Sequence, residues 1–142
     1  MPIDKLFGTT IELVSKNLDL RAKNHMYLAG NVANAETPYY RSKTFSFEDQ
    51  LKDAVRHREE SAAPAVAAHP NHIPLKGSAH RIEDIEGIVD ESNVNGLGRD
   101  GNGVDLEREM GRMAENQILF NASVKILAKK FEGLKYAIKG GN

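Results

Sequence analysis

Apolar side chains recur along the C-terminal part of the chain in alternating steps of four and three. Nine of the ten positions in this row are apolar, and the exception is Gln117. Steps that average 3.5 residues keep one face of a helix turned toward a partner helix over many turns. The row therefore predicts a helix from about Asp105 to Lys139, roughly 50 Å long. Its seam consists of Leu106, Met110, Met113, Gln117, Phe120, Val124, Leu127, Phe131, Leu134 and Ile138.

Both ends of this helix carry residues that favour a helix terminus. Asp105 is placed to cap the first turn, and Glu107 and Glu109 bring negative charge to the exposed N–H groups there. Gly140 and Gly141 end the helix. Cationic side chains gather in the last turns, where the helix dipole favours them: Lys129, Lys130, Lys135 and Lys139.

A second long amphipathic helix is predicted at the start of the chain, from about Asp4 to Asn34. Its apolar row has the same heptad spacing but fails at Arg21 and His25, where neighbouring apolar residues shift the face by one position. We interpret His25 as a partly exposed residue of the seam with no chemical role. The seam residues of this helix are Phe7, Ile11, Val14, Leu18, Leu28 and Val32.

The first helix must end within the segment 31–40. Pro38 disfavours helical backbone at Thr37, and Asn34 is suited to the left-handed conformation that closes a last helical turn. Asn31 and Asn34 are three residues apart and so lie on one face of the helix. Their amides are placed to bind exposed carbonyl groups or the backbone of a partner.

Two weaker signals follow this helix stop. Between Arg41 and Phe47, small polar residues alternate with bulkier neighbours, which favours a short extended segment. Ser46 precedes Asp49 by three positions and is a suitable N-cap for a short helix near residues 47–57. The apolar face of this helix consists of Phe47, Leu51 and Val55.

The rest of the middle segment shows no periodic pattern. Prolines and an Ala-rich run between residues 58 and 80 leave no face that a fold would bury, and residues 96–103 are rich in glycine. We therefore expect a mainly α fold, with two long terminal helices and a loose, partly disordered middle. The expected parts are a first helix with its Asn-rich stop (1–40), an irregular middle (41–103) and a C-terminal heptad helix (104–142).

Composition and charge exclude several classes of protein. With 27% charged residues, 6% aromatic residues and no Trp, a large compact core is not expected. A net charge of −1 leaves no basic surface for nucleic acid or an anionic membrane. The absence of cysteine excludes disulfides and thiolate metal sites. Charges interrupt the N-terminal segment and no long apolar run occurs, so neither a cleaved signal peptide nor direct membrane insertion is expected.

The candidate chemical sites are weak. The histidines of the middle segment lie in a Pro-rich stretch that would not hold them on one helical face, so we expect no metal site. Asp100 begins a segment similar to a calcium loop, but Asp105 stands where that loop needs Gly and Gly111 where it needs Glu. We find no phosphate loop and no nucleophile–base set, and expect no cofactor and no enzyme. The histidines are His57, His69, His72 and His80.

Taken together, these features resemble the bacterial flagellar basal-body rod proteins, and among them a short subtype of the proximal rod. The resemblance lies in Leu20-Arg21, in the helix stop followed by Arg-Ser-Lys, and in the block from Asp100 to Glu109. His69-Pro-Asn-His72 is similar to an element of the family's middle segment. Tyr39 stands where the family usually has Gly, so this turn is made differently here or with strain. The motif residues are Asn31, Asn34, Thr37, Pro38 and Tyr40.

The resemblance implies a structural subunit with no enzymatic activity. Such proteins are exported unfolded, without a cleaved signal, and polymerise as a helical tube across the periplasm that connects the inner-membrane ring and export gate to the rest of the rod. The terminal helices are then an antiparallel coiled coil with both chain ends at one end of the pair, and the Lys-rich end of the last helix lies near Asp4 and Glu12. The implied partners are further copies of the chain, other proximal-rod proteins, the rod–ring adaptor, and membrane-ring and export-gate components.

An alternative of a different class is a soluble helical adaptor or secretion chaperone that binds a partner helix. It would use the same apolar seam but would not need the motif between Asn31 and Tyr40. Fractionation separates the two hypotheses, because a rod subunit co-purifies with basal bodies and an adaptor does not.

Overall fold

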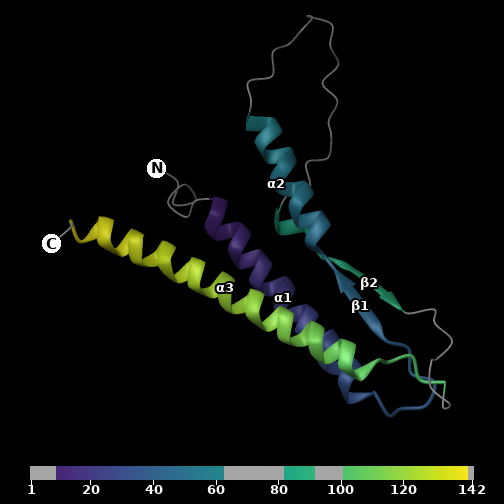
Figure 1. Ribbon diagram of the computed structural model, residues 1–142. Coiled ribbons are helices and arrows are strands. Elements are labelled where there is room, and N and C mark those ends of the chain that lie inside the picture. Colours follow the sequence, from purple (N-terminus) through teal and green to yellow (C-terminus); the bar gives the residue numbers. More distant parts are fainter. Residues whose placement is uncertain (1–8, 63–81, 92–100, 141–142) are drawn as a thin grey trace, which may run out of the picture.

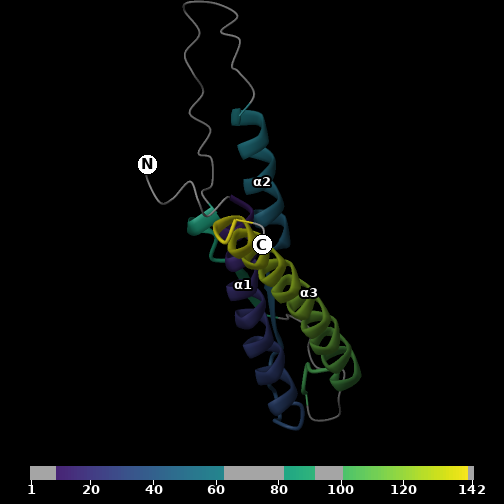
Figure 2. The same cartoon turned by 90° about the vertical axis from the view of Figure 1, so that its left-hand side faces the viewer.

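The computed structural model describes residues 9–62, 82–91 and 101–140, with Thr9 and residues 57–62 described by their backbone alone. α1 and α3 run side by side in opposite directions, as two views of the ribbon show (Figure 1 and Figure 2). The expected mainly α fold with an antiparallel pair of terminal helices is therefore confirmed. Along the chain, the elements are α1 (Thr9–Ala33), β1 (Lys43–Ser46), α2 (Glu48–Ala62), a 3-10 turn η2 (Ile82–Asp84), β2 (Ile88–Glu91) and α3 (Leu106–Ile138).

The bounds of α3 agree with the sequence prediction to within one residue at each end. The Asp105 carboxylate accepts a hydrogen bond of 3.1 Å from the Arg108 N–H, which caps the first turn. Gly140, with a φ of 75°, follows the last turn. α3 has 33 residues and α1 has 25, and the C-terminal end of α3 extends beyond the described start of α1 (Figure 1). Part of α3 therefore has no partner in the described part of the chain.

The start of the first helix cannot be compared with its prediction. Residues 1–8 lie outside the described residues, so the expected start at Asp4, the seam residue Phe7 and the expected proximity of the lysines to Asp4 lie there too. The described helix begins at Thr9, with Glu12 in its first turn, and ends at Ala33.

The helix stop is made differently from the prediction for Asn34. The backbone of Asn34 does not have a positive φ, so the prediction that Asn34 closes the helix in the left-handed conformation is wrong. Its side-chain amide instead donates a hydrogen bond of 2.8 Å to the Gly30 carbonyl, and the Thr37 hydroxyl donates to its amide oxygen at 3.2 Å. Because the Asn34 side chain provides the hydrogen-bond donor for the Gly30 carbonyl of the last turn, a left-handed residue is not required to satisfy that carbonyl.

Tyr39 has the positive φ, at 58°. A bulky residue in the left-handed region is strained by roughly 1–2 kcal/mol. Of the two alternatives, a turn made differently and a turn made with strain, the structure has the second. The Tyr39 side chain is 82% exposed, and its ring lies over Gly101. A Cβ atom at Gly101 would approach the ring Cδ1 to 2.8 Å, so the close contact between these two loops requires glycine at position 101.

A small lobe, made of β1, α2, η2 and β2, packs on α1 and contains the apolar core. Tyr27 stacks on Phe45 with ring centroids 5.4 Å apart, and Phe45 meets Phe47 at 5.6 Å. α2 projects away from the helix pair (Figure 1), so the lobe is held mainly through α1. The buried members of this core are Leu20, Phe45, Phe47, Ala54, Ile82 and Ile85, with Leu13, Tyr27 and Leu51 packed against them.

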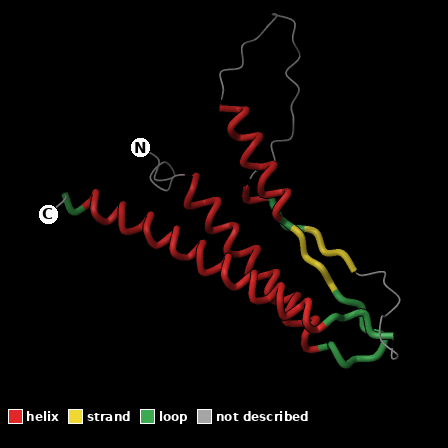
Figure 3. Tube along the Cα trace, viewed as in Figure 1, coloured by secondary structure: helices red, strands yellow, loops and turns green. Residues whose placement is uncertain are grey.

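β1 and β2 form a two-stranded antiparallel sheet (Figure 3). In its register, Lys43 is opposite Glu91 and Phe45 is opposite Val89. The expected extended segment is thus confirmed as β1, whereas β2 is not foreseen in the sequence. Gly87, with a φ of 74°, lets the Phe45 ring lie against its backbone. The Gly87 N–H is bound by the Gln50 side-chain oxygen at 3.2 Å. Part of the segment expected to be irregular is therefore ordered on α1.

The short helix predicted near residues 47–57 is longer, because α2 continues to Ala62. Phe47 is buried and Leu51 and Val55 are half-buried, on the face that the sequence predicts. Expectations of disorder in 63–81 and 92–100 lie outside the described residues, as do Asp100, His69, His72, His80 and the side chain of His57.

Candidate functional site

The contact between α1 and α3 is built on two rows of polar side chains, each spaced by seven residues. A spacing of seven keeps each row on one helical face. In the antiparallel pair, Asn17 meets Ser123 at 3.2 Å, and Asn24 meets Asn116 at 3.4 Å. These polar rows consist of Asn17, Asn24 and Asn31 on α1 and of Glu109, Asn116 and Ser123 on α3, and the three residues on α3 are buried.

The predicted seam of α3 lies beside its polar row instead of on it. Each buried polar residue directly precedes a predicted seam residue, and those three, Met110, Gln117 and Val124, are exposed. Gln117 does not reach α1, because its amide binds Asn121 one turn along α3 at 3.2 Å. The inner seam residues Met113, Phe120, Leu127 and Leu134 are half-buried, and the outer ones, Leu106, Met110, Gln117, Val124, Phe131 and Ile138, are exposed.

The seam of α1 is similarly displaced. Leu28 is buried, but the apolar residues that hold the lobe, Leu13, Leu20 and Tyr27, form a row of their own that the seam does not include. Two faces of α1 thus have separate roles: one faces the lobe, and the other faces α3 and includes the seam residue Leu28, which lines a hollow with Asn116 and Leu119. The other described seam residues, Ile11, Val14, Leu18 and Val32, are half-buried.

Asn31, with no exposed surface, joins three segments of the chain. Its amide nitrogen donates to the Lys43 carbonyl at 2.7 Å and to the Glu109 carboxylate at 2.8 Å, while its oxygen accepts from the Lys43 N–H at 2.9 Å. Asn31 therefore binds β1 as a neighbouring strand would, and binds α3 with its second N–H. The Tyr40 hydroxyl also reaches the Asn31 oxygen, at 3.5 Å.

Glu109 is 3% exposed, and its charge is balanced within α3. One carboxylate oxygen accepts the Asn31 amide, and the other accepts from the Arg112 guanidinium at 3.0 Å. Both oxygens of this buried carboxylate are therefore bound, as a buried charge requires. In the sequence, Glu109 appears only as a charge near the start of a helix.

Asn102 links the segment that ends α1 to the segment that precedes α3 through hydrogen bonds. Its amide nitrogen lies 3.0, 2.7 and 2.8 Å from the carbonyl oxygens of Asn34, Ala35 and Thr37, and its oxygen accepts from the Val104 N–H at 2.7 Å. Beside it, the Gly103 N–H donates to the Tyr40 carbonyl at 3.0 Å. Of the motif residues, Thr37 and Pro38 are exposed and Tyr40 is half-buried.

We expect Asn102→Ala to lower the free energy of unfolding by about 2 kcal/mol, because it leaves loop carbonyls and the Val104 N–H without their donor and acceptor. Urea unfolding followed by circular dichroism measures the change. Asn121→Ala, at an exposed position of α3, is the matched control and should change stability by less than about 0.5 kcal/mol. Equal effects of the two substitutions would contradict the role of Asn102.

Arg21 crosses the interface between the two helices. Its Nη1 donates to the Asn116 side-chain oxygen at 3.4 Å, and the Asn116 amide donates to the Arg21 carbonyl at 3.0 Å. The guanidinium carbon lies 5.4 Å from the centre of the Phe47 ring, so Arg21 also contacts the lobe. Arg21 and Asn116 therefore connect α1, α3 and the lobe at one point.

Polar rows of this kind set the register of a helix pair. Each polar residue is satisfied only when its own partner is opposite, whereas apolar residues tolerate several alignments. A signal for these rows exists in the sequence, as asparagines at 17, 24 and 31 and polar residues at 109, 116 and 123. Apolar periodicity alone does not find it. No helix in the described part of the chain is apolar and long enough to span a membrane.

No model of a known protein family matches the chain. Individual proteins do match over nearly their whole length. The chain is 32% identical to the flagellar basal body rod protein FlgB of Salmonella typhimurium, over 99% of both chains. It is 29% identical to FlgB of Escherichia coli, again over 99% of both, and 29% identical to FlgB of Bacillus subtilis, over 96% of this chain and 98% of that one. The chain belongs to the family of flagellar basal body rod proteins FlgB.

Proposed function

We propose that the chain is a structural subunit of the flagellar basal-body rod, and that it assembles through its terminal helices. One observation carries this proposal: the outer part of the α3 seam is exposed from one end of the helix to the other and is apolar at every position except Gln117. We call this surface the open flank. It comprises Leu106, Met110, Val124, Phe131 and Ile138, which are between 42% and 77% exposed.

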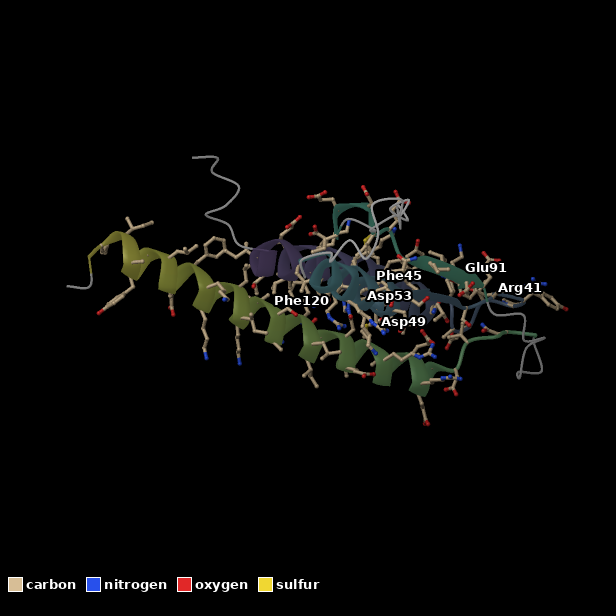
Figure 4. All side chains as sticks on the ribbon, turned by 90° about the horizontal axis from the view of Figure 1, so that it is seen from above. Arg41, Phe45, Asp49, Asp53, Glu91 and Phe120 are labelled. Atoms are coloured by element: carbon tan, nitrogen blue, oxygen red, sulfur yellow. The ribbon has the colours of Figure 1, made fainter. Side chains whose placement is uncertain are left out.

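An exposed apolar row of this length favours association. Full burial of one such side chain contributes roughly 1.5–3 kcal/mol, so a neighbour covering several of them gains enough to hold a contact. Monomeric proteins rarely leave large contiguous apolar patches in water. Figure 4 shows side chains projecting from α3 along its length, away from α1. The open flank is therefore a surface suited to packing against another helix.

The finer features of the proposal rest on the resemblance and on the names of the relatives. The assembly is a helical tube across the periplasm that joins the inner-membrane ring and export gate to the rest of the rod. The chain reaches it by export without a cleaved signal peptide. Its neighbours are further copies, other proximal-rod proteins, the rod–ring adaptor and components of the ring and gate. Such a role needs no catalytic group.

A paired substitution tests the open flank. Val124→Ser/Phe131→Ser removes apolar surface from it, while Lys125→Ser/Glu132→Ser changes the next residues along α3, which are also exposed. Each variant replaces the wild-type chain in flagellated cells, and the amount in purified basal bodies is measured by quantitative immunoblotting. We expect the flank variant to fall at least tenfold and the control to remain near wild type.

Circular dichroism of the purified variants shows whether the helices are intact. Serine is about as good a helix former as Val and Phe and only slightly poorer than Lys and Glu, so neither variant should lose helix for this reason alone. Equal recovery of both variants from basal bodies would contradict a role of the open flank. Absence of the wild-type chain from basal bodies, with recovery in a soluble complex with a helical partner, would instead support an adaptor or chaperone.

A further inference from the structure

A hollow of about 170 Å³ opens between α1 and α3 beside the polar rows. It is lined by Arg21, Ala22 and His25 of α1 and by Asn116, Gln117 and Phe120 of α3. Gln117 and Phe120 belong to the α3 seam, so the hollow lies next to the open flank. Figure 4 labels Phe120 on the stretch of α3 that runs beside α1.

Two nitrogen atoms at this hollow are buried and unsatisfied. Neither Arg21 Nε nor His25 Nδ1 has a hydrogen-bond partner among the described residues. Arg21 Nε always carries a hydrogen, and a buried N–H without an acceptor is destabilising by roughly 1–3 kcal/mol, so this atom indicates that an acceptor belongs there. His25 Nδ1 needs a donor or an acceptor, depending on its tautomer. No acidic residue lines the hollow.

The charge of Arg21 is compensated only in part, by the Phe47 ring next to its guanidinium and by Glu48 and Glu115, which line a second hollow with Arg21. Its polar contact is the long hydrogen bond to Asn116, and no carboxylate in the described part of the chain lies within ion-pair distance of it. An unpaired charge held between two helices is costly, and a guanidinium is most strongly bound by a carboxylate. The apolar walls, Ala22 and Phe120, suit the methylene group of a short acidic side chain.

We propose that this hollow is a socket for an acidic side chain of a second copy of the chain, docked on the open flank. The inference rests on the proposed function and names a contact within it. Charge complementarity favours Asp49 and Asp53 of α2 as the inserted residues. They are one helical turn apart, both exposed, and unpaired in the described part of the chain (Figure 4). α2 projects from the helix pair (Figure 1), so its exposed acids extend away from the chain's own helices.

Photo-crosslinking in assembled rods tests the socket. Gln117, at its exposed rim, is replaced by benzoylphenylalanine in the full chain, and basal bodies from those cells are irradiated and analysed by mass spectrometry. The expected product joins position 117 to a peptide of another copy that contains Asp49 and Asp53. A crosslink to a different protein, to another part of a second copy, or to nothing would overturn the proposal while leaving rod membership intact.

Charge reversal provides the second measurement. Asp49→Lys/Asp53→Lys should lower the amount of chain in basal bodies at least tenfold, and Asp84→Lys/Asp90→Lys, at exposed acids elsewhere on the lobe, should not. Equal recovery of the two variants would overturn the α2 contact. If the wild-type chain itself is absent from basal bodies, the proposed function fails first, so the two failures are distinguishable.

Discussion

Replacing Asn31 by alanine should destabilise the protein by about 3–5 kcal/mol, a large part of the stability of a small domain. The substitution leaves the Lys43 carbonyl, the Lys43 N–H and one Glu109 oxygen without a partner, in a site that excludes water. Each buried polar group that loses its partner lowers the free energy of unfolding by roughly 1–3 kcal/mol, and a charged group lowers it by more. We expect β1 and the start of α3 to separate from α1 together.

The measurement is urea unfolding of the purified chain, followed by circular dichroism. Asn24→Ala is the matched control, because Asn24 is an asparagine of the same row that is half-buried and makes one long bond, of 3.4 Å. It should lower stability by less than about 1 kcal/mol. A loss at Asn31 no greater than that at Asn24 would show that Asn31 does not join the three segments.

Asn116→Leu should also destabilise the protein, by about 2–3 kcal/mol, although it places an apolar residue in a helix interface. Among the described residues, the substitution removes the one side-chain acceptor of Arg21 and leaves its guanidinium between the helices. Adding Arg21→Leu removes that charge, and the double variant should recover most of the lost stability. A buried polar pair replaced by two apolar residues is often neutral or stabilising, whereas removal of one member is not.

A double-mutant cycle measures this coupling directly, from the free energies of unfolding of the wild type, the two single variants and the double variant. We expect a coupling energy of about 1–2 kcal/mol. Additive effects would mean that Arg21 and Asn116 act independently. The double variant should in addition lose rod incorporation if the socket binds a carboxylate, because it has lost Arg21 while keeping its fold.

The long helices could be predicted because their signals are local. The alternating row from Leu106 to Ile138 and the cap at Asp105 depend on residues close in sequence, and the observed α3 follows them. The strand β1 and the face of α2 around Phe47 are also local patterns. The strain at Tyr39 is expected from the resemblance, which implies glycine at this position of the turn, and Tyr39 has a φ of 58°.

The partners of those faces could not be predicted, because they depend on residues distant in the sequence. Apolar periodicity predicts that the heptad seam of α3 meets α1, but the hydrogen bonds to α1 are made by the polar row one position before Met110, Gln117 and Val124. Asn31 and Glu109 are 78 residues apart, and their pairing appears only when both helices are placed. The strand β2 has exposed Ile88 and Val89 and so lacks the alternation that marks a half-buried strand.

This division of faces has a functional consequence under the proposed role. Polar contacts inside the pair fix which side of α3 meets α1, and the apolar open flank stays available to another subunit. A pair held largely by hydrogen bonds is also weaker than one with an apolar core, since a hydrogen bond contributes about 1 kcal/mol net. Such a pair is easily unfolded, as export of an unfolded chain requires.

The most direct test of this account is a density map of the isolated basal body at side-chain resolution. We predict that α1 and α3 remain paired through Asn17–Ser123, Asn24–Asn116 and Asn31–Glu109, with the open flank covered by a neighbouring subunit. A rod in which Val124 and Phe131 face α1 of the same copy, or in which the flank faces solvent, would contradict it.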